Sequence, residues 1–268
     1  MASSPCPTAL QMPDKPLSGK VAVVTGVTRS IGIGKAVATR LAIAGASIFT
    51  TYYRPFDQEM PWGVSAGEPE QILEDLRALG VGAQGIEIDL SDTASPPVIF
   101  KSALDFFGQI DILVNNAAFS IDVDILALNS QILNAHLSVN VMGTMLLCQQ
   151  FVQHWTGREG GRIINLTSGQ GYAPMPGNLA YAASKGAIDA FTTSLSAEVM
   201  GRGITVNAVD PGPTDTGWMS DELHEQLTVA APLGRVGTPD DAARLILFLA
   251  SSEAEWITGQ IIRSRGGL

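Results

Sequence analysis

Short apolar runs rich in valine and isoleucine recur along the chain at a regular spacing. They span residues 20–25, 47–52, 84–89, 111–114, 162–167, 204–209 and 260–262. Runs of this length, bounded by polar and turn-forming residues, are typical of buried β-strands. The pattern therefore predicts a sheet of seven strands.

The segments between these runs show the spacing of helices. Ile33, Val37 and Leu41 recur with a period close to 3.6 residues, so strand and helix alternate along the chain. Such alternation requires right-handed crossovers, a parallel sheet and helices on both of its faces. We expect a doubly wound, Rossmann-type α/β fold, and a length of 268 residues fits a single domain.

Two segments depart from this alternation. Residues 1–17 contain four prolines and little periodicity, which predicts a loose N-terminal extension before a domain spanning residues 18–268. The stretch from residue 55 to 69, between the second strand and its helix, carries three prolines and Trp62. We expect a surface loop or lid there.

Composition and charge exclude several function classes. A net charge of −10 and the lack of a basic stripe argue against a nucleic-acid partner. Cys6 and Cys148 offer neither a disulfide framework nor zinc spacing, which favours a reducing cytoplasm. His136, His154 and His224 are scattered, so we expect no metal site. The sequence contains no uninterrupted apolar stretch of about 18 residues, so it predicts no membrane span.

Polar residues, glycine and proline follow four of the predicted strands. These positions are Thr25 and Gly26, residues 115–116, residues 167–168 and residues 210–212. In doubly wound sheets, ligands bind beyond the carboxyl ends of the strands, near the point where the strand order reverses. The sequence therefore predicts a ligand site at this edge.

The first of these junctions is a glycine-rich turn, TGVTRSIGIGK, that leads directly into a helix. Gly26 permits the tight turn, Gly32 lets the backbone approach a pyrophosphate, and Gly34 allows close packing of the helix. The free N–H groups and the dipole at the helix start attract phosphate groups. A glycine-rich turn by itself is weak evidence, because many tight turns bind nothing.

Tyr181 and Lys185 are four residues apart in a helical segment, so they share one face, and Ser168 stands thirteen residues earlier at a strand end. An ammonium about 6 Å from a phenol, at an effective dielectric of about 20, lowers its pKa by about two units. We therefore expect Lys185 to lower the Tyr181 pKa toward the range of efficient acid–base catalysis. Taken singly, such a pair is more often a surface pair, and such a serine more often a turn residue.

Together these motifs resemble the short-chain dehydrogenase/reductase family. Ser168, Tyr181 and Lys185 match its catalytic spacing, and Asn140 in LSVNVMGT matches the asparagine that completes the set. The glycine-rich turn differs, since five residues rather than three separate Gly26 from Gly32. The resemblance implies hydride transfer between a nicotinamide cofactor and a carbonyl or alcohol, with these four residues catalytic.

The resemblance also implies which residues hold the cofactor. They are Gly26, Arg29, Ile31, Gly32, Ile33, Arg54, Asp89, Leu90, Asn116, Ala117, Tyr181, Lys185, Pro211, Gly212, Thr214 and Thr216. Within this set, Asp89 resembles the residue that accepts from the adenine amine, with helix capping as an alternative role. The segment 211–216 resembles the one that covers the nicotinamide, although an ordinary proline-rich turn is also possible.

Charge indicates which nicotinamide cofactor fits. The second strand ends in Tyr52 and Tyr53, without the carboxylate that bonds the ribose hydroxyls in NAD sites. Arg29 and Arg54 can both extend toward a 2′-phosphate as charged donors. We therefore expect NADP(H) to be preferred, with NAD(H) also possible.

Substrate identity depends on residues 117–130 and on a predicted substrate loop at 213–236. We favour a small free ketone or alcohol, with a 3-oxoacyl-[acyl-carrier-protein] reductase activity as the alternative that the negative charge mildly opposes. A non-catalytic dinucleotide-binding sensor is a further alternative, against which the intact catalytic set argues. The family habit implies a homotetramer or homodimer, although Arg265 replaces an acid in the C-terminal interface segment.

Overall fold

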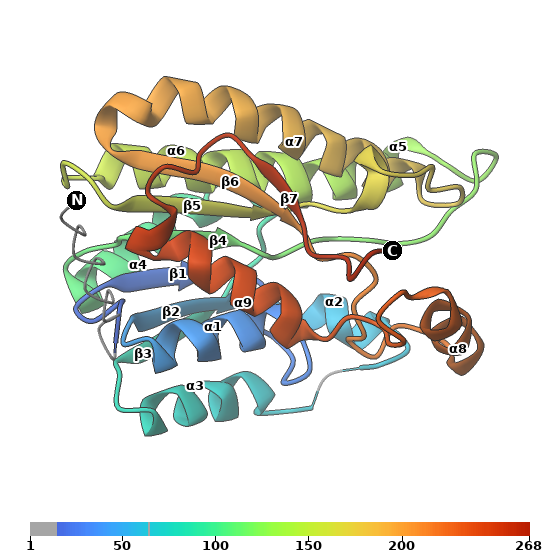
Figure 1. Ribbon diagram of the computed structural model, residues 1–268, viewed down its shortest axis with the longest axis horizontal. Coiled ribbons are helices and arrows are strands. Elements are labelled where there is room, and N and C mark those ends of the chain that lie inside the picture. The colour runs from blue at the N-terminus through green and yellow to red at the C-terminus, as the bar shows by residue number, and fades with distance from the viewer. Residues whose placement is uncertain (1–14, 64) are drawn as a thin grey trace, which may run out of the picture.

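Seven parallel strands form one sheet in the computed structural model, which describes residues 15–63 and 65–268. The strands are β1 (Val21–Val24), β2 (Ser47–Tyr52), β3 (Ala83–Glu87), β4 (Ile112–Asn115), β5 (Gly161–Leu166), β6 (Ile204–Asp210) and β7 (Ile261–Arg263). Their order is β3-β2-β1-β4-β5-β6-β7, with the reversal between β1 and β4 (Figure 1). The expected doubly wound sheet is confirmed.

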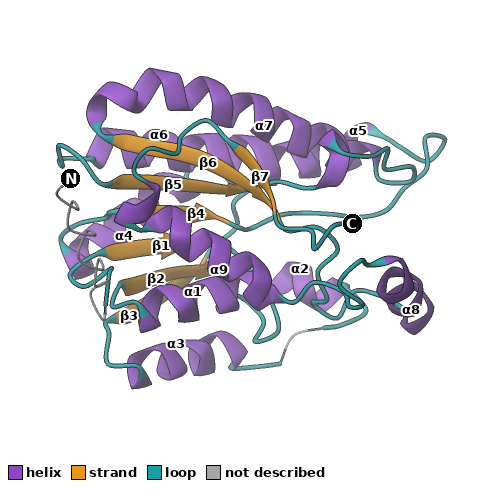
Figure 2. Cartoon of the chain, viewed as in Figure 1, coloured by secondary structure: helices purple, strands orange, loops and turns teal. Residues whose placement is uncertain are grey.

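Helices cover both faces of the sheet (Figure 2). The α-helices are α1 (Ile33–Ile43), α2 (Arg54–Glu59), α3 (Glu68–Ala78), α4 (Ser95–Phe107), α5 (Ser130–His136), α6 (Thr144–His154), α7 (Leu179–Val199), α8 (Asp221–Ala230) and α9 (Pro239–Ala250). Side chains of α1, α3 and α9 share one buried cluster, whereas those of α4, α6 and α7 share the other. Figure 1 shows α2 and α8 at the end of the sheet toward which the strands point.

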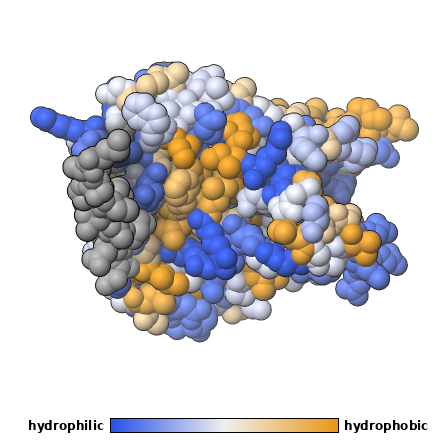
Figure 3. Space-filling model, viewed as in Figure 1, coloured by the Kyte–Doolittle hydropathy of each residue, from blue (hydrophilic) through white to orange (hydrophobic). Residues whose placement is uncertain are grey.

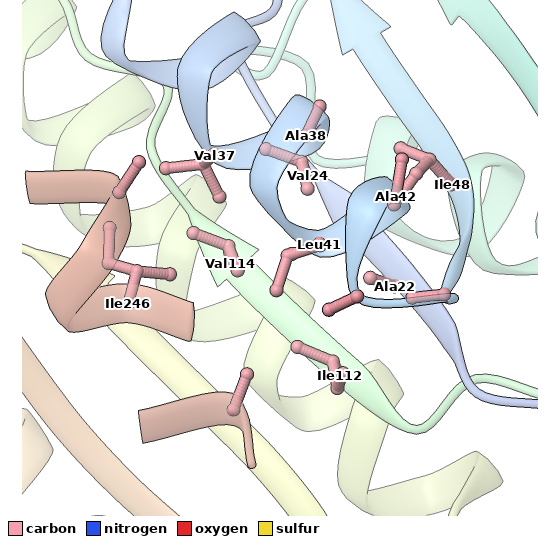
Figure 4. Close-up of a cluster of buried hydrophobic side chains, with 14 of the residues drawn as sticks. Ala22, Val24, Val37, Ala38, Leu41, Ala42, Ile48, Ile112, Val114 and Ile246 are labelled. Atoms are coloured by element: carbon pink, nitrogen blue, oxygen red, sulfur yellow. The ribbon is translucent and has the colours of Figure 1, made fainter. Parts of the chain in front are cut away.

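The two cores follow from the alternation of side chains along each strand. Ala22 and Val24 of β1 pack on the α1 side, while Val23 between them packs on the α4 side. Figure 4 shows Leu41 of α1 and Ile246 of α9 near side chains of the central strands. Full burial of one such large aliphatic side chain contributes about 1.5–3 kcal/mol to the free energy of unfolding.

The insert between β2 and α3 is more regular than the sequence suggested. Residues 54–59 form helix α2, with Pro55 in its first turn. Proline is favoured there because its fixed φ suits a helix and the N–H that it lacks has no intrahelical acceptor at that position. A helix of six residues is too short to produce a recognisable 3.6-residue period, so the prediction of an irregular loop was wrong for this part.

The N-terminal extension was expected to reach residue 17. Residues 1–14 lie outside the described part of the chain. Leu17 is buried, and its backbone N–H donates to the carbonyl of Ala44 at 2.8 Å. The folded region therefore already includes Leu17. Within residues 15–63 and 65–268, no helix combines the length and hydropathy needed to cross a bilayer.

Candidate active site

The glycine-rich turn joins β1 to α1 and packs directly on the loop after β4. Gly26 has a φ of +73°, and a Cβ there would lie 2.7 Å from the Cα of Ala117. A Cβ on Gly34 would lie 2.7 Å from Asn116 Nδ2. Asn116 Nδ2 also donates to the carbonyls of Thr25 at 2.8 Å and Gly26 at 3.0 Å. Glycine at both positions is thus required by close approach of the two loops.

The start of α1 is open to an anion. Gly32 is the N-cap residue, no side chain caps the first turn, and no acid lies in it. The first N–H groups of a helix have no intrahelical acceptor, so they and the helix dipole can bind a phosphate. This arrangement fits the pyrophosphate site that the sequence predicted.

A cleft of about 670 Å³ opens beside this turn, between the loops that follow β1, β2, β3 and β4. Most predicted cofactor residues on this side line it: Gly26, Arg29, Gly32, Ile33, Asp89, Leu90, Asn116, Ala117 and Thr216. The cleft lies within the size range of small-molecule and cofactor sites. Its position and lining fit the adenosine half of a dinucleotide, and we call it the adenosine cleft.

Asp89 does not have the helix-capping role that the sequence left as an alternative, because the N-cap residue of α4 is Ala94 and no side chain caps that helix. Its carboxylate accepts from the backbone N–H of Ser91 at 2.8 Å, and it also bonds the hydroxyl of Tyr53. Burial, followed by the charge of Asp89 and this hydrogen bond, raises the Tyr53 pKa above its ordinary value. Asp89 therefore shapes the end of β3 while it lines the cleft.

The two arginines expected at a 2′-phosphate are placed differently. Arg29 lines the adenosine cleft. Arg54 does not line it, because its guanidinium forms two hydrogen bonds to Glu87, at 3.0 and 2.5 Å, and lies 3.7 Å from Glu70. The hydrogen bonds from Arg54 lower the Glu87 pKa, although burial opposes them. The structure brings Arg29 to the cleft and leaves Arg54 paired outside its lining.

Arg29 has neighbours that the sequence did not reveal. Its Nε lies 3.2 Å from Asp57 Oδ1, and its Nη1 donates to the carbonyl of Thr216 at 3.0 Å. Its guanidinium carbon stands 4.8 Å from the ring centre of Trp62. Asp57 belongs to α2, and Phe56 beside it packs on Phe119 with ring centres 5.3 Å apart. The α2 insert therefore contributes directly to the cleft.

Ser168, Tyr181 and Lys185 come together where β5 ends and α7 begins. Ser168 follows the strand and forms a hydrogen bond with Tyr181. Lys185 is buried; its Nζ donates to the carbonyl of Leu166 at 2.8 Å and lies 5.5 Å from the ring centre of Tyr181. The three residues that the spacing predicted to group together thus lie together in three dimensions.

The protonation equilibria differ from the expectation. Burial raises the pKa of Tyr181 to about 12, the hydrogen bond with Ser168 opposes this rise, and the charge of Asp210 adds to it. Burial lowers the pKa of Lys185 to about 8, against a raising effect of Asp189. The predicted lowering of the Tyr181 pKa by Lys185 is therefore wrong for this structure, because desolvation of the buried phenol is the largest influence on this pKa.

Asn140 links two parts of the site through its side chain. It lies in a π-helical stretch, Leu137–Gly143, and exchanges hydrogen bonds with the backbone of Phe119 at 2.7 and 2.9 Å. Its Nδ2 also donates to Ser184 Oγ at 2.9 Å. The side chain therefore ties the loop after β4 to α7.

The turn after β6 is held by an ion pair. Asp210, which is 2% exposed, accepts from Arg265 Nη1 at 3.0 Å and from the backbone N–H of Gly212 at 2.9 Å. The hydroxyl of Thr214 donates within the same turn to the carbonyl of Pro211. Arg265, the residue that replaces an acid in the C-terminal segment, thus stabilises the turn expected to cover the nicotinamide.

Four of the predicted cofactor residues, Ile31, Pro211, Gly212 and Thr214, do not line the adenosine cleft. Ile31 is 53% exposed, although a Cβ on Gly217 would lie 2.8 Å from it.

Comparison with known proteins finds a family model and curated relatives that match most of the chain. A family model described as enoyl-(acyl carrier protein) reductase matches residues 26–268. An uncharacterized oxidoreductase, YjdA, of Bacillus subtilis is 46% identical over 250 residues, covering 92% of this chain and 96% of that protein. The 3-oxoacyl-[acyl-carrier-protein] reductase FabG of Aquifex aeolicus is 36% identical over 256 residues, covering 94% and 98%.

A solved structure agrees with these relatives. A short chain dehydrogenase from Burkholderia cenocepacia, in complex with NADP, superposes with a TM-score of 0.85 at 34% identity. The match covers 94% of this chain and 98% of the other. The fold and nearly the whole length are therefore shared.

Proposed function

Because the chain belongs to the short-chain dehydrogenase/reductase family, we propose that it transfers a hydride between NADP(H) and a carbonyl or alcohol substrate. The family establishes an oxidoreductase; the cofactor choice and the substrate class are our proposal. The observation that carries it is the convergence of Ser168, Tyr181 and Lys185 at the end of β5. A binding protein without turnover has no need of a buried phenol and ammonium.

In the proposed mechanism, the substrate oxygen lies between the hydroxyls of Ser168 and Tyr181. Ser168 orients and polarises this oxygen, and Tyr181, protonated because its pKa is near 12, delivers the proton during reduction. Lys185 holds positive charge near the phenol. The nicotinamide cofactor, when bound, supplies the hydride, so the protein contributes position and electrostatics. Asn140 fixes the loop that borders this space.

Several features support NADP(H) as the preferred cofactor, while NAD(H) remains possible. Arg29 lines the adenosine cleft, and β2 ends in Tyr52 without a carboxylate at its tip. The Burkholderia cenocepacia relative is a complex with NADP. The cleft and the uncapped start of α1 fit a dinucleotide, which Gly26, Gly32, Ile33, Asn116 and Thr216 would hold.

A panel of ketones and alcohols, followed by the absorbance of the reduced nicotinamide with NADPH and NADH in parallel, tests this proposal. We expect turnover of at least one carbonyl substrate, at a higher rate with NADPH than with the same concentration of NADH. Failure of every substrate class, with the protein folded and the dinucleotide bound, would leave only the sensor alternative.

A second candidate is reduction of 3-oxoacyl chains on an acyl carrier protein. The FabG relative favours it. The name of the matching family model also refers to an acyl-carrier-protein substrate, although to its enoyl form. A net charge of −10 opposes the approach of an acidic carrier, since like charges slow association. Comparing one 3-oxoacyl group as a free ester and as the carrier thioester separates the two. A preference for the carrier form would select this second function.

The proposal includes the setting and the assembly of the enzyme. A cysteine pattern without a disulfide framework supports a reducing cytoplasm. Figure 3 shows apolar residues gathered near the middle of the face that carries β7 and α9. Phe248 of α9 and Ile261 of β7 are exposed, as is Trp256 in the segment between these elements. This apolar surface supports self-association into a dimer or tetramer. Light scattering after size exclusion should give a multiple of 28.2 kDa.

We also retain a substrate loop at residues 213–236 as part of the proposal. It contains α8, and Trp218 in it is 48% exposed while its indole N–H donates to the carbonyl of Thr214 at 3.0 Å. The loop follows the turn after β6, next to the catalytic end of the sheet. Its exposed aromatic ring and its place support a role in substrate contact.

A further inference from the structure

The α2 insert places a carboxylate against the arginine of the adenosine cleft. Asp57 is 7% exposed, and its Oδ1 lies 3.2 Å from Arg29 Nε. The same oxygen accepts from the indole N–H of Trp62 at 2.9 Å. Little of either charged side chain reaches solvent, at 14% for Arg29 and 10% for Asp57. Water therefore screens this ion pair weakly.

Arg29 is the cation on which a 2′-phosphate depends. Among the described residues that line the adenosine cleft, Arg29 is the cation, while Asp57, Glu59 and Asp89 are acids. Arg54 is bound to Glu87 outside the lining. A phosphate entering this half of the cleft thus meets a negative surface unless Arg29 faces it.

The position of Asp57 is held by its surroundings. Phe56, one residue earlier, packs on Phe119 of the loop after β4. Trp62 lies under the guanidinium of Arg29 and binds the carboxylate. The carboxylate therefore comes from a short helix anchored on both sides of the cleft, rather than from the tip of β2.

We propose that Asp57 competes with the 2′-phosphate of the cofactor for Arg29, and that this residue sets the discrimination between NADP(H) and NAD(H). The inference rests on the proposed use of a nicotinamide dinucleotide. NAD(H) carries no 2′-phosphate and leaves the Arg29–Asp57 pair intact. The 2′-phosphate of NADP(H) must share Arg29 with the Asp57 carboxylate or displace that carboxylate. The negative charge of Asp57 also repels the phosphate.

The substitution Asp57→Asn isolates the charge. It preserves the side-chain shape and the oxygen that accepts from Trp62, and it removes the negative charge that pairs with Arg29 and repels a phosphate. The affinity for NADPH should rise about tenfold, the size of a charge-assisted hydrogen bond gained. The affinity for NADH should change less than about threefold, because it offers no group to the Arg29 guanidinium at that place.

Equilibrium titrations of NADPH and NADH, followed by nicotinamide fluorescence, measure this without any turnover. Glu59→Gln is the matched control, because it removes the same charge from the same helix, lines the same cleft and forms no ion pair among the described residues. The control should shift the ratio of the two dissociation constants less than about threefold. In an Arg29→Gln background, Asp57→Asn should lose its effect on that ratio.

Equal changes for both cofactors, an unchanged ratio, or an effect that persists without Arg29 would each overturn the proposal. Thermal unfolding checks that each variant is folded, and Asp57→Ser, which also removes the charge, replaces Asp57→Asn if that variant does not fold. A wild-type protein that binds NADPH yet turns over no substrate would remove the proposed function and leave this inference standing. Wild-type protein that binds neither dinucleotide would overturn both.

Discussion

The adenosine half and the catalytic half of the site treat their cations in opposite ways. In the adenosine cleft Arg29 is paired with Asp57, and just outside its lining Arg54 is paired with Glu87. In the catalytic half, Lys185 is buried and bonds the carbonyl of Leu166. A carboxylate contact fixes the charge of a cation, whereas a neutral partner leaves its protonation free to respond to burial. Under the proposed function, the first arrangement would serve recognition of the cofactor and the second would serve proton transfer.

The largest expected effect comes from Tyr181→Phe, which removes the proton donor and keeps the ring. We expect kcat/KM to fall by about 10³-fold, within the range of general acid–base contributions. Steady-state rates on any accepted substrate measure this, and the dissociation constant for NADPH serves as the control, since it should stay within a few-fold. Activity that also stays within a few-fold of wild type would remove Tyr181 from the mechanism.

The ion pair between Arg265 and the buried Asp210 extends the comparison to protein stability. Arg265→Leu leaves Asp210 buried without its partner, and we expect the free energy of unfolding to fall by about 3 kcal/mol. Denaturant unfolding measures the change. Combining it with Asp210→Ala should recover much of the loss, because no lone charge is then buried. Equal losses in the single and double variants would contradict this account.

The pH dependence tests Lys185 directly. Its pKa in the folded protein is about 8, below the ordinary value of 10.5, so it loses its proton as pH rises through 8. The rate of carbonyl reduction should fall above that pH. Between these two values the unfolded chain binds more protons, so Lys185 makes the free energy of unfolding rise with pH. Lys185→Met should abolish this contribution in unfolding experiments at several pH values.

A smaller shift is expected from Asp189→Asn, one helical turn beyond Lys185. Asp189 raises the Lys185 pKa, so its loss should move the alkaline limb of the rate profile downward by about half a pH unit. Its carboxylate also accepts from Gln170 Nε2 at 2.6 Å, which Asn can still do. A limb that stays in place would show that Asp189 acts only on packing.

The smallest effect should follow Arg54→Ala. Because Arg54 is bound to Glu87 outside the cleft lining, the affinity for NADPH should change less than about threefold. Arg29→Gln should weaken NADPH binding considerably more than NADH binding. Isothermal titration of both variants compares the two arginines, and a larger loss for Arg54 would reverse the assignment made here.

Much of the fold could be read from local patterns. The run at residues 20–25 became the buried strand Val21–Val24, because buried strands favour apolar β-branched residues. The run at 260–262 became Ile261–Arg263, but this edge strand is largely exposed, so the expectation of a buried strand was wrong there. The grouping of Ser168 and Tyr181 was also predictable, since helical periodicity and a strand end fix their relative places. Helix α2 was missed because six residues are too few to show a period.

Long-range charge pairing was beyond the sequence. Arg29 and Asp57 are distant in the chain, and nothing in their local context marks them as partners. The burial of Tyr181 raised its pKa where pairwise electrostatics alone predicted a lowering. Both failures have one cause: desolvation and partner choice depend on how separate segments pack. A carboxylate and a tryptophan within one short insert beside a glycine-rich turn is the signal that could have suggested Asp57.

The contact between Asp210 and Arg265 joins segments 55 residues apart in the chain. It constrains how this protein can be recombined with its relatives. A chimera that received a C-terminal segment with an acid in place of Arg265 would set two carboxylates face to face in a buried space. Exchange of the turn after β6 alone, with loss of Asp210, would instead leave the Arg265 guanidinium without its carboxylate partner. The two segments therefore have to be inherited, or grafted, as one unit.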